Sequence, residues 1–269
     1  MWLWFALAFL LSLFATRLVR RFAERFGVLD RPEVSPERKL HTRPVPLLGG
    51  LAVYAAFLLI VLTILLVQPH VLLGGYLLPK HIIGLVLGGL LLMIGGWRDD
   101  RCPRNPREQL LWPILAALVI VGSGIGITSV TNPLGEAFRL DQWSTTLFSI
   151  GDKPYRIVWL ADAFAFTWLM VSMYATKLLD GLDGLVSGIG VIGMFVIAAV
   201  SLTPKVGQPE TALLAFIAAG AFFGFLMFNF HPAKIFLGEG GSLLAGFLLG
   251  TFAILSGGKI ATALQILGI

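Results

Sequence analysis

The chain has 269 residues, of which 57% are apolar and only 13% are charged, and its mean hydropathy is +0.87. A soluble domain carries about 25% charged residues, so this composition indicates a polytopic, all-α membrane protein with one domain over residues 1–269. The net charge of +5 suggests basic loops beside anionic lipid. The sequence has no basic stripe interleaved with aromatic residues, so it does not predict a nucleic-acid partner. Cys102 is the only cysteine, which excludes an internal disulfide and a zinc site built on paired cysteines.

Taken in chain order, apolar runs of about 17–25 residues predict a bundle of about eight or nine membrane-spanning helices. The runs of sufficient length lie near residues 2–18, 48–67, 81–97, 110–128, 157–176, 185–203, 211–229 and 242–256. A last run, 260–269, offers about ten residues where roughly twenty are needed. We therefore expect a chain truncated at its C-terminus, or a last segment that lies flat or packs elsewhere. Residues 127–156 predict short strands with a turn, to which we assign no chemistry.

The basic residues predict the orientation of this bundle. Most of the 20 Lys and Arg residues fall in loops on one side, above all in the segments that follow the first and third spans. The positive-inside rule makes that side cytoplasmic, which predicts a multi-pass protein of the inner (plasma) membrane with its N-terminus outside. The acidic motifs considered below all fall on this side, so they predict one active site at the cytoplasmic face.

Residues 180–184, with the sequence Asp-Gly-Leu-Asp-Gly, form the most informative motif of the chain. Carboxylates are costly beside a bilayer, so two of them between two apolar runs indicate that a cation, a proton or a phosphate is bound there. Asp99-Asp100 follows another apolar run, and Gly-Glu-Gly-Gly-Ser at 238–242 precedes one more. Plainer interpretations exist, because a solvated helix end would explain Asp99-Asp100 and a turn would explain Glu239.

The order and spacing of the motifs resemble the polyprenyl-phosphate N-acetylhexosamine-1-phosphate transferases, glycosyltransferase family 4. The Arg38-Lys39-x-His41 segment resembles the branch that uses undecaprenyl phosphate and UDP-GlcNAc, and not the branch that transfers phospho-MurNAc-pentapeptide. The resemblance covers residues 28–250 and rests on five segments: Asp30-x-Pro32, the run from Arg38 to Gly50, the run from Gly96 to Asp100, the 180–184 motif, and the run from Asn229 to Ser242.

This resemblance implies transfer of a sugar-1-phosphate, GlcNAc-1-phosphate, from a UDP-sugar to undecaprenyl phosphate, with release of UMP, as the first membrane step of cell-envelope polysaccharide synthesis. Both reacting groups are anions, so a Mg²⁺ ion, or Mn²⁺ in its place, would screen their repulsion. The residues implied are Asp180 and Glu239 as metal ligands, Asp99, Asp100 and Asp183 as catalytic groups, and Arg38, Lys39, His41, Lys177, Gly181, Gly184, Asn229 and Lys234 as substrate-binding groups.

Some positions depart from the family pattern. The family usually has Asn three and six residues before the first Asp of the 180–184 motif, where this chain has Lys177 and Tyr174. Glu239 stands where the family usually has Asp. If the helix continues to Asp180, Lys177 shares a face with it and either holds a substrate phosphate or clamps this carboxylate. The plainer alternative is a lysine that snorkels to the cytoplasmic interface from the end of the span. The family also has a His-rich cytoplasmic loop near its C-terminal end, which this chain does not reach.

Two other hypotheses stay open. One is a non-catalytic or fragmentary relative with a structural role in the membrane. The other is a cation-coupled transporter, which is less favoured because transporter sites lie near the bilayer midplane whereas these acids gather at one face. The exact sugar and the oligomeric state, a homodimer included, also stay open.

Overall fold

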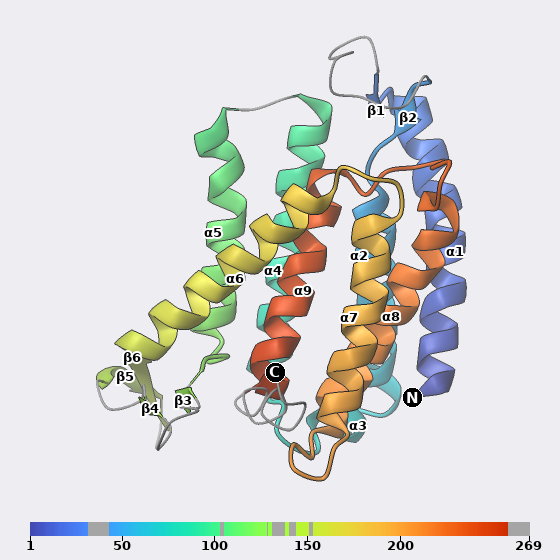
Figure 1. Ribbon diagram of the computed structural model, residues 1–269. Helices are drawn as coiled ribbons and strands as arrows, with labels where there is room; N and C mark the ends of the chain where they lie inside the picture. Colours follow the sequence, from blue (N-terminus) through green and yellow to red (C-terminus); the bar gives the residue numbers. More distant parts are fainter. Residues whose placement is uncertain are drawn as a thin grey trace.

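The computed structural model describes residues 1–31, 43–102, 105–127, 129–130, 138–139, 144–150 and 153–257. Its helices run largely along one axis and form a bundle, and one of them, α6, crosses the others at a steep tilt (Figure 1). The long helices in the described part are α1 (Trp2–Phe26), α2 (Gly49–Val67), α4 (Pro79–Arg101), α5 (Pro106–Gly122), α6 (Trp159–Leu179), α7 (Leu185–Ser201), α8 (Pro209–Asn229) and α9 (Gly238–Gly257).

Each of these helices corresponds to one of the predicted apolar runs. Five of them, α1, α2, α4, α8 and α9, are long and apolar enough to cross a membrane. The helices α5 and α7 have 17 residues each and are shorter than the others. A single helical turn, α3 (His70–Leu73), was not predicted. The run 260–269 lies outside the described residues.

Several predicted helix ends were wrong. The first helix was expected to end at residue 18 but continues to Phe26. The basic residues after the apolar run end its hydrophobicity, but arginine is a good helix former and the helix continues through them. The fourth was expected over 110–128, whereas α5 begins at Pro106 and ends at Gly122. Pro106 occupies the first helical position, where its missing N–H costs nothing. Similarly, α9 begins at Gly238 and not at residue 242.

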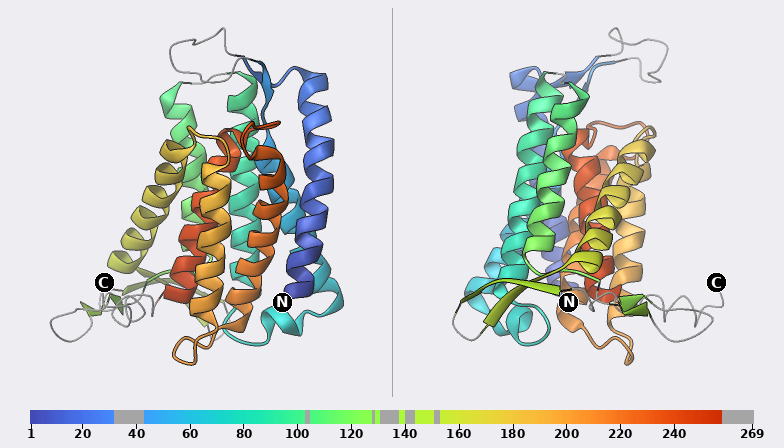
Figure 2. Two further views of the ribbon diagram at one scale, coloured as in Figure 1. Left: turned by 45° about the vertical axis from the view of Figure 1, so that its right-hand side comes forward. Right: turned by 90° about the vertical axis from the view of Figure 1, so that its left-hand side faces the viewer.

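Short antiparallel strands lie outside the bundle. At the end where α1 finishes, β1 (Leu29–Asp30) pairs with β2 (Val45–Pro46). At the opposite end (Figure 2), β3 (Ser129–Val130) pairs with β4 (Phe138–Arg139), and β5 (Ser144–Ile150) pairs with β6 (Lys153–Val158). The described parts of the segment 127–156 therefore contain the strands that the sequence predicts there.

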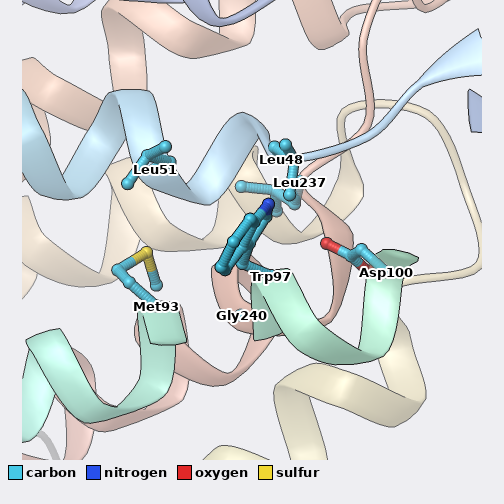
Figure 3. A pocket seen from close by; sticks show the side chains of 8 residues that line it. Leu48, Leu51, Met93, Trp97, Asp100, Leu237 and Gly240 are labelled. Carbon is cyan, nitrogen blue, oxygen red and sulfur yellow. The ribbon is translucent and has the colours of Figure 1, made fainter. Parts of the chain in front are cut away.

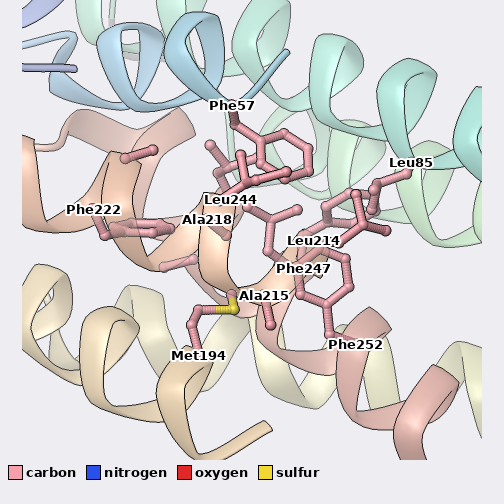
Figure 4. Packing of buried hydrophobic residues seen from close by; sticks show 14 of the residues in the cluster. Phe57, Leu85, Met194, Leu214, Ala215, Ala218, Phe222, Leu244, Phe247 and Phe252 are labelled. Carbon is pink, nitrogen blue, oxygen red and sulfur yellow. The ribbon is translucent and has the colours of Figure 1, made fainter. Parts of the chain in front are cut away.

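The core of the bundle is built around α8 and α9, which are buried along most of their length. Figure 4 shows their side chains interlocking with those of α2, α4 and α7. Among the described residues, the largest fully buried side chains are phenylalanines: Phe57, Phe222, Phe225, Phe247 and Phe252. Within lipid, helix association depends on close packing and hydrogen bonds between helices. The Ser12 hydroxyl of α1, which donates to the Ala221 carbonyl of α8 over 2.6 Å, is such a bond.

Candidate active site

The three acidic motifs meet at one end of the bundle. The C-terminal ends of α4 and α6 and the N-terminal ends of α7 and α9 all lie at its upper end in Figure 1. Asp99-Asp100 ends α4, the 180–184 motif connects α6 to α7, and Glu239 lies in the first turn of α9. Residues far apart in the sequence therefore form one acidic site.

Close backbone contacts fix the start of α9 between α2 and α4. A Cβ atom added to Gly96 of α4 would collide with the backbone of Gly240, and one added to Gly50 of α2 would collide with the backbone of Gly241. These contacts leave no room for larger residues, so the glycines position the first turn of α9 against both helices.

Asp100 caps this first turn from a different helix. Its Oδ1 accepts a hydrogen bond from the backbone N–H of Glu239 over 2.9 Å. The first N–H groups of a helix have no partner within the helix, so a carboxylate is a favourable acceptor there. Its carboxylate also lies close enough to those of Asp99, Asp180 and Glu239 to be repelled by them. The predicted catalytic residue Asp100 thus has a clear structural role, and its catalytic role stays a prediction.

Lys177 of α6 forms an ion pair with Glu239 of α9. The distance from its Nζ to Glu239 Oε1 is 2.5 Å, and the two side chains are only 26% and 16% exposed. The shared helical face on which a clamp on Asp180 depended does not form, because α6 ends at Leu179 and Asp180 leaves the helical conformation with ψ of 49°. The phosphate-holding alternative stays a prediction. The Lys177 ammonium also lies 5.6 Å from the centre of the Tyr174 ring, within cation–π range. Lys177 therefore contacts both the other unusual position of α6, Tyr174, and the unusual acid of α9, Glu239.

Asp180 follows α6 directly. The residue as a whole is exposed, yet its carboxyl group lies near Ser242 and Glu239. Desolvation of this group, followed by repulsion from the Glu239 carboxylate, raises the pKa of Asp180 to about 7, while a hydrogen bond with Ser242 opposes the shift. The surroundings of Asp180 therefore disfavour the charged form of its carboxyl group.

Asp183 and Asn229 hold the loop that connects α8 to α9. Asp183 Oδ2 accepts the backbone N–H of Ala233 over 2.9 Å and lies 3.0 Å from Nδ1 of the exposed His231. The buried Asn229 accepts from the Ser187 hydroxyl over 2.7 Å and donates to the Ile235 carbonyl over 3.0 Å. Their catalytic and substrate-binding roles stay predictions. Ser187 was not predicted, and the only signal for it in the sequence was a polar residue within an apolar run.

The remaining predicted residues lie in α4, in the two loops at this end of the bundle, or outside the described part of the chain. Asp99 accepts two hydrogen bonds from the Gln109 side chain of α5, at 3.0 and 3.2 Å, and Gln109 was not predicted. Gly184 adopts φ of +75° immediately before α7, a conformation that favours glycine. Open space surrounds Gly181, and Lys234 is exposed in the α8–α9 loop. Arg38, Lys39 and His41 lie outside the described residues.

A small pocket lies beside the capped start of α9. Figure 3 shows Trp97 and Asp100 of α4 pointing toward Leu48 and Leu237, which close its other side. Met93, Leu51 and the glycines at 240 and 241 also line it, so the lining is mostly apolar. Asp100 is thus the acidic group at the boundary between this apolar pocket and the acidic site.

The donor set fits a hard divalent cation. Mg²⁺ is usually bound by one or two carboxylates, with water and substrate phosphates as the remaining ligands. Asp180 and Glu239 supply two carboxylates that lie close together. Among the residues that the structure describes, no group of three or more His, Cys, Asp or Glu is arranged to hold a metal ion. Two protein ligands with open positions therefore remain a suitable arrangement for Mg²⁺.

The family of the chain follows from comparison with known proteins. The model of glycosyl transferase family 4 matches residues 82–257, which is more than half of the chain. The chain belongs to glycosyl transferase family 4. The part of this family member that the model matches begins in α4 and ends with α9, so it contains all three acidic motifs.

Two of the curated relatives that resemble this family member have a polyprenyl phosphate in their names. It is 34% identical over 263 residues to the decaprenyl-phosphate N-acetylglucosaminephosphotransferase of Mycolicibacterium smegmatis, with 94% of this chain and 59% of the relative covered. It is 29% identical over 262 residues to the Bacillus subtilis protein named "Probable undecaprenyl-phosphate N-acetylglucosaminyl 1-phosphate transferase", with 97% and 64% covered. It is 28% identical over 275 residues to the phospho-N-acetylmuramoyl-pentapeptide-transferase of Geobacillus kaustophilus, with 98% and 76% covered. The chain thus spans less than two thirds of the first two relatives.

Proposed function

We propose that this family member transfers GlcNAc-1-phosphate from UDP-GlcNAc to undecaprenyl phosphate and releases UMP. The observation that supports this most is the meeting of Asp99-Asp100, the 180–184 motif and Glu239 at one end of an apolar helix bundle. A lipid phosphate and a soluble nucleotide sugar can both reach such a place, because it lies where the membrane-embedded helices end. The names of the Mycolicibacterium and Bacillus relatives favour GlcNAc as the sugar and a polyprenyl phosphate as the acceptor.

The reaction replaces one phosphoanhydride bond to the β-phosphorus with another. An oxygen of the lipid phosphate forms a bond to the β-phosphorus of UDP-GlcNAc, and the bond from this phosphorus to the bridging oxygen breaks. The electron pair leaves with UMP, and the product is a lipid diphosphate sugar. Catalysis of phosphoryl transfer consists mainly of positioning and charge stabilisation, so the protein has to hold two anions together.

The residues at the site divide this work. Asp180 and Glu239 would hold a Mg²⁺ ion, which screens the phosphate charges when it is bound. Asp99 or Asp100 would keep the lipid phosphate deprotonated, a modest role because the second phosphate pKa is about 6. Gly181, with open space around it, would let the diphosphate approach the backbone. Lys234 and Lys177 are cations at the same end that would contact phosphates.

The proposed topology puts this end of the bundle in the cytoplasm. Eight or nine spans would cross the inner (plasma) membrane, with α5, α6 and α7 added to the five helices that are long and apolar enough. Basic residues lie in the last turns of α1 and α4, at the end that carries the acidic site, which favours a cytoplasmic location for it. UDP-sugars are cytoplasmic metabolites, so the proposed orientation and substrate agree.

The proposal is tested by measuring UMP release from UDP-GlcNAc with undecaprenyl phosphate, using the full-length protein in detergent or nanodiscs. Asp180→Asn removes the charge of a proposed metal ligand, and we expect it to lower turnover by on the order of a hundredfold. Asp162→Asn is the matched control, because Asp162 caps the opposite end of α6 by accepting from the Val158 N–H. Undiminished turnover of Asp180→Asn would rule out the ligand assignment. An inactive wild-type protein that is correctly folded would favour the non-catalytic alternative.

A further inference from the structure

The ion pair between Lys177 and Glu239 is the feature that the proposed function leaves unexplained. The two residues come from different helices, 62 positions apart, and meet at 2.5 Å. Both side chains are more than half buried. The Lys177 ammonium contacts the carboxylate that is proposed to bind the metal. Because an ammonium and a divalent cation repel each other, the two compete for the oxygen atoms of Glu239.

The contact is built into the crossing of α6 and α9. The hydroxyl of Thr176, next to Lys177, donates to the Ser242 carbonyl over 2.8 Å. At the next turn, Gly246 of α9 leaves no room for a Cβ atom beside the carbonyl of Ser172. These contacts hold the two helices close together, so Lys177 lies within reach of Glu239.

The surroundings of the pair are strongly acidic. Glu239 is close enough to Asp99, Asp100 and Asp180 to interact with each of them electrostatically. The lysine is further held over the ring of Tyr174. Lys177 forms an ion pair with Glu239 of this acidic group. Its single positive charge therefore offsets part of the repulsion among the carboxylates.

We propose that Lys177 is an internal counter-cation that competes with the divalent metal for Glu239 and so lowers the metal affinity of the site. The inference rests on the proposed function, because it takes Glu239 to be a metal ligand. Before the metal binds, the ammonium neutralises Glu239 and stabilises the acidic cluster. To bind the metal through Glu239, the protein has to release this ammonium, which is then available to a substrate phosphate. The metal requirement is thereby linked to the charge at position 177.

The test is a titration of the purified protein with Mn²⁺, in which free Mn²⁺ is measured by electron paramagnetic resonance without any substrate. We expect Lys177→Gln to lower the Kd for Mn²⁺ by about tenfold, because it removes the competing charge. Lys177→Arg retains the charge and should stay within about twofold of the wild type. Lys205→Gln removes the same charge from an exposed loop between α7 and α8 and should leave the Kd unchanged. Thermal unfolding of each variant confirms that it is folded.

A double-mutant cycle shows whether the effect passes through Glu239. In the Glu239→Gln background, the Lys177→Gln change should alter the Kd by at most about threefold. An unchanged or raised Kd for Lys177→Gln in the native background would overturn the proposal, and so would a tenfold effect that persists without Glu239. The titration uses no substrate, so a failure of the transferase assay would leave this result intact. Failure of the counter-cation proposal would likewise leave the transferase proposal intact.

Discussion

Asp100 combines a structural task with a proposed chemical one, and the two can be separated at the scale of one residue. An asparagine keeps a side-chain oxygen for the N–H of Glu239 but loses the charge, whereas an alanine loses both. We expect Asp100→Asn to unfold at nearly the same temperature as the wild type and to lose most of its turnover. Asp100→Ala should lose turnover and also about 0.5–2 kcal/mol of stability, as expected for a lost helix cap.

These outcomes are read from thermal unfolding in detergent together with UMP release. If Asp100→Asn is fully active, the role of Asp100 is restricted to capping α9, and the catalytic assignment is wrong. If Asp100→Ala is as stable as the wild type, the hydrogen bond of 2.9 Å to Glu239 contributes nothing measurable.

Single residues also show how far sequence reasoning extends. Carboxylates beside apolar runs are costly, and this cost identified the 180–184 motif and Asp99-Asp100 as candidate functional groups. The partner of Lys177 could not be predicted in the same way. Helical spacing pointed to Asp180, three residues away, but the helix ends before it. The true partner, Glu239, depends on how α6 crosses α9, and no local pattern contains that information.

At the scale of elements, α9 is positioned by glycine contacts with its neighbours. A methyl group at Gly96 would collide with Gly240, next to Glu239. We expect Gly96→Ala to push the start of α9 away from α4, to cost about 1–3 kcal/mol of stability and to lower turnover, because the displaced turn carries a proposed metal ligand. Stability and UMP release measure the two effects.

Gly188 of α7 provides the matched control for this change. It is also a helical glycine, and a Cβ atom added there meets nothing within 4 Å. Gly188→Ala should therefore be neutral or stabilise the protein by up to about 1 kcal/mol through its better helix propensity. Equal behaviour of the two alanine variants would mean that the close approach of α4 and α9 does not position the site.

The elements themselves followed closely from the apolar runs, whereas their ends did not. Hydrophobicity marks the part of a helix that contacts lipid or core, which explains the good agreement for α2 and α8. It does not mark the part that continues into polar surroundings, as in α1 beyond residue 18. For α9, the early start at Gly238 depends on a cap from Asp100 of another helix. Such ends are decided by tertiary contacts that hydrophobicity does not record.

For the whole molecule, the grouping of acids at one end of the bundle restricts the kinds of function. A transporter binds its coupling ion near the middle of the membrane, where both sides can be reached in turn. Here α4 and α6 end, and α9 begins, where the acids are. A site at a helix end can instead receive one substrate from the lipid and one from the solvent on a single side. This arrangement agrees with the transferase proposal and makes the orientation of the bundle a decisive property.

The orientation has a natural reporter, because Cys102 is the only cysteine of the chain and is exposed directly after α4, at the end that carries the acidic site. We expect a membrane-impermeant maleimide to leave Cys102 unlabelled in intact spheroplasts and to label it once the membrane is opened. The control is a Cys102→Ser, Lys205→Cys variant, whose single thiol lies in the α7–α8 loop at the opposite end (Figure 1) and should be labelled from outside. Labelling of Cys102 in intact spheroplasts as fast as the control would place the acidic site outside, away from cytoplasmic UDP-sugars, and would contradict the proposed function.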